Sequence, residues 1–276
     1  MKYIAPPRDA VDPQVFSRMP LAAWRDHAGL IEGRDWPSIE ALNAHLPAAA
    51  RECFVAQTRE LLADGLHYER RIAERGEIAT RERNWHDLFN ALVWLRHPAL
   101  KRALNARQAA EVARMGPKTR SRAQCALTHF DEAGVIVVAS DPALIAPWDA
   151  HDWHRLFWRE RTAWQDGRAQ LEVFGHALLE HALTPGKLLV GKALVFHSTQ
   201  AMEVVLAHAA AAIAHGELLC DPLELRPLPL SGLPGWHPHS DDEAFHRHAA
   251  CYQPRRTGRS YPPAVRLGHL GRAALV

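Results

Sequence analysis

The sequence predicts an α+β fold: a mostly helical single domain with a short β-hairpin, few strands and a proline-rich C-terminal segment wrapped around the body. Three observations lead to this prediction. Apolar residues recur at helical spacing in several stretches between residues 36 and 215. Residues 135–139 are instead continuously apolar, largely β-branched and bounded by Gly134 and Asp141, which is typical of a buried strand. The 276 residues, 47% hydrophobic and 23% charged, suffice for one large core.

The N-terminal half is predicted to begin with an extended lead-in over residues 1–20, which carries four prolines. Two segments, 67–73 and 77–80, flank Gly76 and are predicted to form the hairpin. Asn84 is placed to cap a strong helix that Pro98 ends. Helical spacing and boundary residues predict further helices at residues 36–46, 48–62 and 99–115.

In the C-terminal half, residues 190–196 are predicted to form a second strand or an extended segment. Ser198 or Thr199 is placed to cap a long helix over residues 201–215. Prolines become frequent from Asp221 onward, so residues 221–276 are predicted to be irregular and packed on the body. Other helices are predicted at residues 121–128, 153–166 and 171–182.

Composition excludes several classes of protein. No apolar run approaches the ~18 residues that span a bilayer, and the N-terminal MKYIAPPRDAVDPQVF lacks the apolar segment of a secretory signal. Four cysteines stand far apart without a CxxC pair, which favours reduced thiols and a cytoplasmic protein. The formal charge is only +2, so nucleic-acid binding would require a local basic patch.

One block, TRERNWHDLFNALVW at residues 80–94, is distinctive. Together with LTHFDEAG at 127–134, FGHALLE at 174–180 and LPGW at 233–236, it resembles a proteobacterial family of uncharacterised proteins, classed as a domain of unknown function. The resemblance extends from about Tyr68 to Arg256. It implies a shared architecture and no particular activity.

The same block suggests a metal site at the start of a helix. His86 and Asn90 are four residues apart and therefore share a helical face. Asp87 lies beside His86, and Asn84 stands at the cap. These groups could hold a divalent cation and polarise a water molecule, with His86 and Asp87 as the catalytic pair and Asn84 and Asn90 binding substrate.

Other interpretations of this block remain open. A hairpin followed by a helix, with His67 near the first strand, superficially resembles the ββα-metal nucleases, although the hairpin loop is short. The His86-Asp87 doublet also occurs in helical metal phosphohydrolases, which need a separate histidine and aspartate. Alternatively, the role is structural: Asn84 caps the helix, Asp87 favours its positive end and His86 is hydrogen-bonded inside.

A second candidate is the pair His176 and Glu180, which share a face of another predicted helix and have a spacing that can chelate one ion. The pair does not match the HExxH pattern of zinc proteases. Phe174, Leu178 and Leu179 around it are expected in the core, so His176 could equally be a buried, hydrogen-bonded imidazole.

Three further features of the sequence each allow a functional and a purely structural interpretation. The adjacent carboxylates Asp131-Glu132 can bind metal or act as acid and base, or they are turn residues. The histidines at 237, 239, 246 and 248 can capture metal adventitiously or form a surface loop. A basic run could bind phosphate-rich partners or be a solvated helix face; it comprises Arg96, Lys101, Arg102, Arg107, Arg114, Lys118, Arg120 and Arg122.

These observations favour a metal-dependent hydrolase acting on a phosphoester. His86, Asp87, His176 and Glu180 would hold the ion, and Arg81 would bind the substrate anion because its planar fork matches phosphate. The cofactor would be a divalent metal ion, and the partner a small or phosphate-containing ligand. The alternative is a non-catalytic ligand- or partner-binding protein in which the same groups form a buried polar network.

Overall fold

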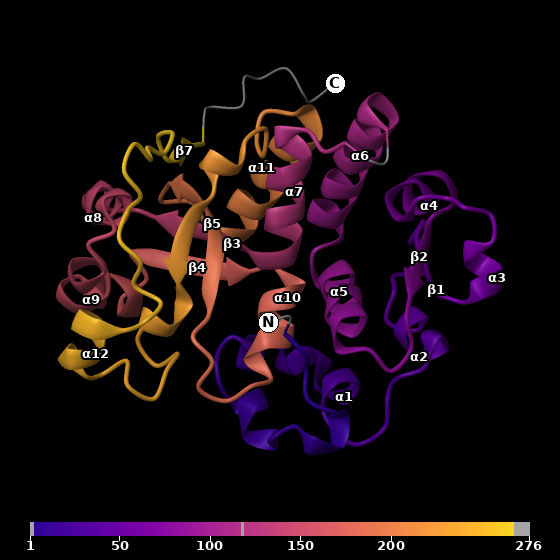
Figure 1. Ribbon diagram of the computed structural model, residues 1–276, viewed down its shortest axis with the longest axis horizontal. Coiled ribbons are helices and arrows are strands. Elements are labelled where there is room, and N and C mark those ends of the chain that lie inside the picture. Colours follow the sequence, from indigo (N-terminus) through magenta and orange to yellow (C-terminus); the bar gives the residue numbers. More distant parts are fainter. Residues whose placement is uncertain (1–2, 117–118, 268–276) are drawn as a thin grey trace.

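The computed structural model describes residues 3–116 and 119–267, and its centre is a five-stranded mixed sheet (Figure 1). The strands are β3 (Gly134–Ala139), β4 (Ala169–Val173), β5 (Val190–His197), β6 (Arg226–Pro229) and β7 (Val265–Arg266). Their order is β4-β3-β5-β6, and β7 also pairs with β5. The pair β3 and β5 is parallel, whereas β4 and β6 run antiparallel to their neighbours.

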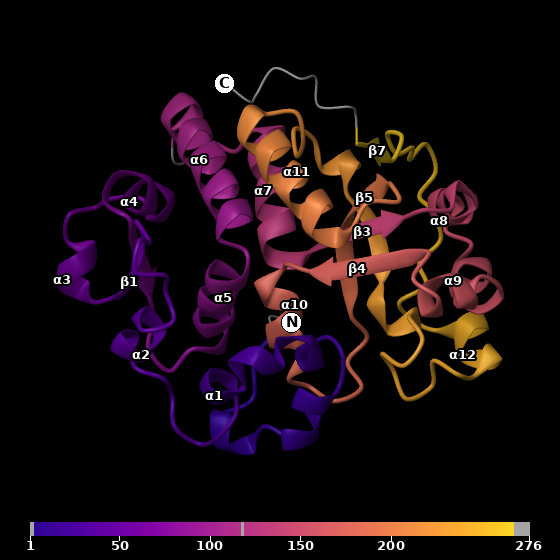
Figure 2. The same ribbon diagram turned by 180° about the vertical axis from the view of Figure 1, so that it is seen from behind.

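Every residue of β3 is buried, which explains its continuous apolar sequence and confirms the predicted strand. Helices α7 (Arg122–Ala133) and α11 (Met202–His215) pack against the sheet. At the end of the molecule far from β1 and β2 lie α8 (Ile145–Ala150), α9 (Arg161–Gln165) and α12 (Glu243–His248), as both ribbon views show (Figures 1 and 2).

A second, two-stranded sheet lies at the other end and is parallel: β1 (Cys53–Ala56) with β2 (Glu77–Thr80). The segment predicted at 77–80 is a strand, β2, but the predicted hairpin is wrong, because the segment before Gly76 is the helix α4 (Tyr68–Arg75). The His67 side chain caps this helix and Gly76 ends it in a left-handed conformation, with φ 72°. Parallel strands need a long crossover, which α3 (Arg59–Leu62) and α4 provide here.

The predicted helix over residues 48–62 is also wrong, because its middle forms β1. Asn43, the last residue of α2 (Ile39–Asn43), pairs with the backbone of Phe54 in this strand. Its Oδ1 accepts from the Phe54 N–H at 2.8 Å, and its Nδ2 donates to the Phe54 carbonyl at 2.9 Å. Asn43 and the pairing strand β2 both lie outside the segment 48–62, so its own periodicity does not reveal the strand.

Three helices connect the two sheets along the chain: α5 (Trp85–Arg96), capped by Asn84 as predicted, α6 (Pro98–Met115) and α7. The predicted helix over residues 171–182 is only half correct. Its first part is the end of β4, and α10 (His176–Ala182) begins after Gly175 and packs on α5 and α7.

The lead-in predicted to be extended contains two short 3-10 segments, Arg8–Ala10 and Pro13–Ser17. A third, Leu21–His27, and α1 (Ala28–Ile31) follow it. The lead-in is fixed to the body, since the Trp85 indole N–H donates to the Pro6 carbonyl at 3.1 Å. Further 3-10 turns span Pro142–Leu144, Pro222–Glu224 and Leu230–Gly232, and a π-helical turn, Arg155–Arg159, interrupts the helix predicted at 153–166.

The C-terminal segment is less irregular than predicted, because it contributes β6, β7 and α12; residues 268–276 of it lie outside the described residues. About half of the described residues are helical, less than the mostly helical fold predicted. The buried apolar side chains of both sheets belong to one core cluster, consistent with an α+β domain. Among the described residues, no helix is long and apolar enough to cross a bilayer.

Candidate metal centre

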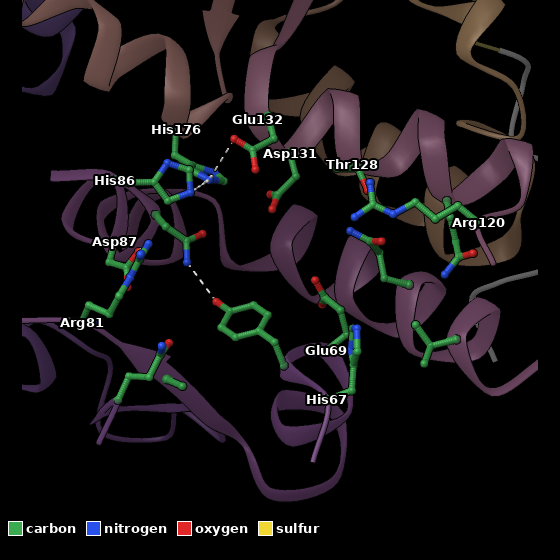
Figure 3. Close-up of a pocket in the computed structure, with 17 residues that line it drawn as sticks. His67, Glu69, Arg81, His86, Asp87, Arg120, Thr128, Asp131, Glu132 and His176 are labelled. Atoms are coloured by element: carbon green, nitrogen blue, oxygen red, sulfur yellow. Dashed lines mark hydrogen bonds and ion pairs between the residues drawn. The ribbon is translucent and has the colours of Figure 1, made fainter. Parts of the chain in front are cut away.

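A polar cavity of about 320 Å³ lies between α4, α5, α6 and α7, with α10 closing one side (Figure 3). Its volume is that of a site for a small molecule. Most of its wall consists of ionisable, amide or hydroxyl side chains: Gln57, His67, Tyr68, Glu69, Arg81, His86, Asp87, Asn90, Gln108, Arg120, Gln124, Thr128, Asp131, Glu132 and His176.

Three of these side chains converge closely enough to hold one metal ion: His86 of α5, Glu132 of α7 and His176 of α10. One ligand atom from each lies within 4.8 Å of the others. The two histidine Nε2 atoms are 3.1 Å apart, and the Nε2 atom of His176 is 3.7 Å from Oε2 of Glu132.

Helix ends fix these three positions. His86 is the second residue of α5, whose first turn is held by the Asn84 cap. His176 is the first residue of α10 and Glu132 is near the end of α7. Gly175, just before α10, lets this helix approach the end of α7. A Cβ atom at position 175 would lie 2.5 Å from the Ala133 Cα atom.

Glu180 lies on the outer side of His86: its Oε2 atom is 3.3 Å from Nδ1. This hydrogen bond raises the pKa of His86, and a proton held on Nδ1 leaves the Nε2 lone pair facing His176. Burial lowers the pKa of His176 to about 3, so its imidazole is neutral, as a metal ligand must be. Its buried Nδ1 atom has no hydrogen-bond partner among the described residues.

The structure gives Asp87 another partner. Its carboxylate accepts three hydrogen bonds from Arg81: from the backbone N–H at 2.7 Å, and from Nε and Nη2 of the side chain at 3.0 and 2.7 Å. Asp87 therefore anchors Arg81 at the cavity wall, and it is not part of the group formed by His86, Glu132 and His176. Asn84 accepts the Asp87 backbone N–H, which is the capping role considered for it.

Asn90 belongs to a polar network that runs from the cavity wall to buried Lys101. Its Nδ2 donates to the Tyr68 hydroxyl at 3.0 Å, and its Oδ1 accepts from Lys101 Nζ at 2.7 Å. Lys101 also donates to Asp131 at 2.6 Å. The side chain of Lys101 is only 5% exposed, and these two oxygens satisfy much of its charge.

Glu69 is a cavity residue to which the sequence analysis gave no role. Its carboxylate accepts from Asn105 Nδ2 at 2.7 Å, and burial raises its pKa to about 7. Glu132 was considered only together with Asp131, yet the structure separates the pair: Asp131 contacts Lys101 and Glu132 contacts His176. No spacing rule identifies either partner, because each contact joins distant segments.

The basic run is distributed over separate contacts. Most of its members are bonded individually to a carboxylate or carbonyl of the body, and Lys118 lies outside the described residues; the bonded members are Arg96, Lys101, Arg102, Arg107, Arg114 and Arg122. In the histidine tract, His246 is buried and contacts the Tyr252 hydroxyl and the Ser240 carbonyl. His246 is thus a structural residue.

The model of one protein family, described as "Protein of unknown function (DUF3025)", matches residues 53–256. This match includes His86, Glu132 and His176 together with the whole cavity wall. No curated protein and no solved structure matches the chain. The resemblance inferred from the sequence blocks is thereby confirmed at the level of a domain of unknown function, and the chain belongs to the DUF3025 family.

Proposed function

We propose that this protein is a metal-dependent hydrolase that acts on a small phosphoester in the cavity between α4, α5, α6 and α7. The observation that carries the proposal is the convergence of His86, Glu132 and His176 at the cavity wall. Two imidazoles and one carboxylate are a ligand set of catalytic zinc, in which a further position is left for water or substrate.

The distances within the group agree with this assignment. Two nitrogen ligands of a tetrahedral zinc ion, each at 2.0–2.1 Å, lie about 3.3 Å apart. The two Nε2 atoms of His86 and His176 are 3.1 Å apart, and both rings come from different helices. Glu180 would orient His86 through Nδ1, as carboxylates commonly do for metal-bound histidines. In this proposal Glu180 supports a ligand, whereas Glu132 is the ligand.

The bound ion would lower the pKa of a coordinated water molecule and so supply a nucleophile near neutral pH. Arg81 supports a phosphoester substrate. Asp87 engages its Nε and Nη2 atoms, so the guanidinium is held in place while Nη1 makes no bond to a described residue. An immobilised guanidinium at the wall favours binding of a phosphate oxygen.

The proposal is tested by activity on p-nitrophenyl phosphate and bis(p-nitrophenyl) phosphate after loading with zinc or manganese. Glu132→Gln should lower kcat at least about 100-fold while the circular dichroism spectrum is unchanged, because an amide is a poor ligand. Glu203→Gln, an exposed change on α11, should retain activity. Equal activity in Glu132→Gln and the parent, or no metal-dependent turnover, would contradict the proposal.

A second candidate is a ligand-binding protein without catalysis. The buried network of Tyr68, Asn90, Lys101 and Asp131 favours it, because such a network can rigidify a cavity without chemistry. This alternative predicts that the protein binds a cavity ligand but hydrolyses neither phosphoester with any metal.

A further inference from the structure

The part of the cavity formed by α6 and the start of α7 presents hydrogen-bond donors that no described residue uses. We infer that Arg120 and Gln124 form an anion-binding subsite, separate from the His86, Glu132 and His176 group, that recognises a second acidic group of the substrate. The inference deepens the proposed function by defining the substrate class. Figure 3 shows the Arg120 side chain reaching into the cavity from the side opposite His86.

Arg120 is an exposed residue whose guanidinium lines the cavity. Among the described residues it makes no ion pair, although six other members of the basic run each contact a carboxylate or a carbonyl oxygen. Arg81, the other guanidinium in the wall, is neutralised by Asp87. An unpaired guanidinium that lines a cavity is a site for an oxyanion, which it can bind with two parallel hydrogen bonds.

Gln124 supplies a second donor whose orientation is fixed. Its Oε1 atom accepts the Ser121 N–H at 2.9 Å in the capping box of α7, so the side-chain NH2 group must be the free end. Gln124 is only 5% exposed, lines the cavity, and donates to no described residue. The amide donor is therefore free to bind a ligand or water oxygen in the cavity.

Two neighbours extend the polar surface. Thr128 lies four residues after Gln124 on the same face of α7, and both residues line the cavity. Gln108 of α6 also lines the cavity, and its side chain bonds to no described residue. Arg120, Gln124 and Thr128 therefore combine one cation with neutral donors, a composition that favours an anion over a cation. Glu69 lines the same cavity near Gln108, and its carboxylate accepts a hydrogen bond from Asn105.

The charges of the residues around the cavity are consistent with an anion-binding subsite at Arg120. Asp87 offsets Arg81 and Asp131 offsets Lys101. The two charges of a divalent ion would be offset by Glu132 and by Glu180, which is hydrogen-bonded to His86, and burial raises the pKa of the wall residue Glu69 to about 7. Arg120 is then a wall guanidinium with no carboxylate to offset it among the described residues. A metal ion and a separate guanidinium in a cavity of about 320 Å³ favour a small substrate with two anionic groups, one at the reacting bond and one distal.

The subsite is tested on chelator-treated protein, so that no metal ion can bind the probe. Inorganic phosphate is titrated by isothermal calorimetry into the parent and three variants. Arg120→Gln should weaken binding at least about tenfold. Gln124→Glu preserves the capping box but replaces the NH2 donor with a carboxylate, and should weaken binding similarly. Arg122→Gln is the matched control: Arg122 pairs with Asp221, so binding should be unchanged.

Equal phosphate affinity in the parent, Arg120→Gln and Gln124→Glu would overturn the inference, as would absence of phosphate binding by the parent. Retained circular dichroism spectra exclude unfolding as the cause of a loss. Because the phosphate titration is made without metal, its result does not depend on whether the protein is a hydrolase. Conversely, an active metal enzyme that binds phosphate only after metal loading would retain the proposed function and refute the subsite.

Discussion

At the scale of single residues, neighbouring carboxylates have different roles because different segments reach them. Asp131 is bonded to buried Lys101, whereas Glu132, the next residue, faces His176. The sequence identified His86 and His176 as candidate ligands from helical spacing. It did not select Glu132 over Asp131, since the choice depends on where α6 and α10 lie against α7.

Glu69 gives a pH-dependent prediction. Burial raises its pKa from 4.5 to about 7, so the native state binds this proton more tightly than the unfolded chain. The contribution of Glu69 to stability should therefore be fully present below pH 4.5 and be lost as the pH rises to about 7. The free energy of unfolding of the parent should fall relative to Glu69→Gln over this range in urea titrations. Parallel curves for the two proteins would contradict this prediction.

Asp87 gives a second prediction, which concerns stability and metal content. Asp87→Asn removes a charged acceptor of three hydrogen bonds from Arg81 and should lower the free energy of unfolding by about 1–3 kcal/mol. Metal content should stay as in the parent, because Asp87 is outside the ligand group. Thermal unfolding and elemental analysis of the same sample check both parts. Loss of the metal with unchanged stability would instead make Asp87 a ligand.

At the scale of elements, local pattern predicted the parts of the fold that local interactions determine. The capped helix α5, the long helices α6 and α11 and the buried strand β3 lie close to where the sequence places them. β2 lies where an extended segment was predicted, but β1 and its parallel pairing with β2, with Cys53 opposite Glu77, were missed because the pairing joins segments that are not adjacent in the chain. The break at Gly175 was missed because its cause is the close approach of Ala133.

A substitution at Gly175 tests whether the packing of α10 on α7 positions the metal group. In Gly175→Ala the new Cβ would lie 2.5 Å from Ala133 Cα, so α10 must shift and His176 with it. We expect a loss of about 1–3 kcal/mol in stability and weaker metal binding. Gly29→Ala in α1, where nothing lies within 4 Å, is the matched control and should be neutral or stabilising. Equal melting temperatures and metal affinities for the two variants would contradict this account.

At the scale of the whole molecule, three helices from separate parts of the chain supply the metal group. The residues His86, Glu132 and His176 come together only in the folded protein, so an ion should bind the native state and not the unfolded chain. Added zinc should consequently raise the melting temperature by an amount that grows with its concentration. In His176→Ala, differential scanning fluorimetry should show no such rise; a rise equal to that of the parent would place the ion elsewhere.

The most direct test of the central claim is the metal content of untagged protein purified without chelator, measured by elemental analysis. The exposed histidines His239 and His248 are replaced by alanine in all samples, which removes adventitious ligands without touching buried His246. The account predicts about one zinc, manganese or iron ion per parent chain and almost none in Glu132→Gln. Equal metal content in the two proteins, or a parent that binds no ion even after zinc is added, would contradict it.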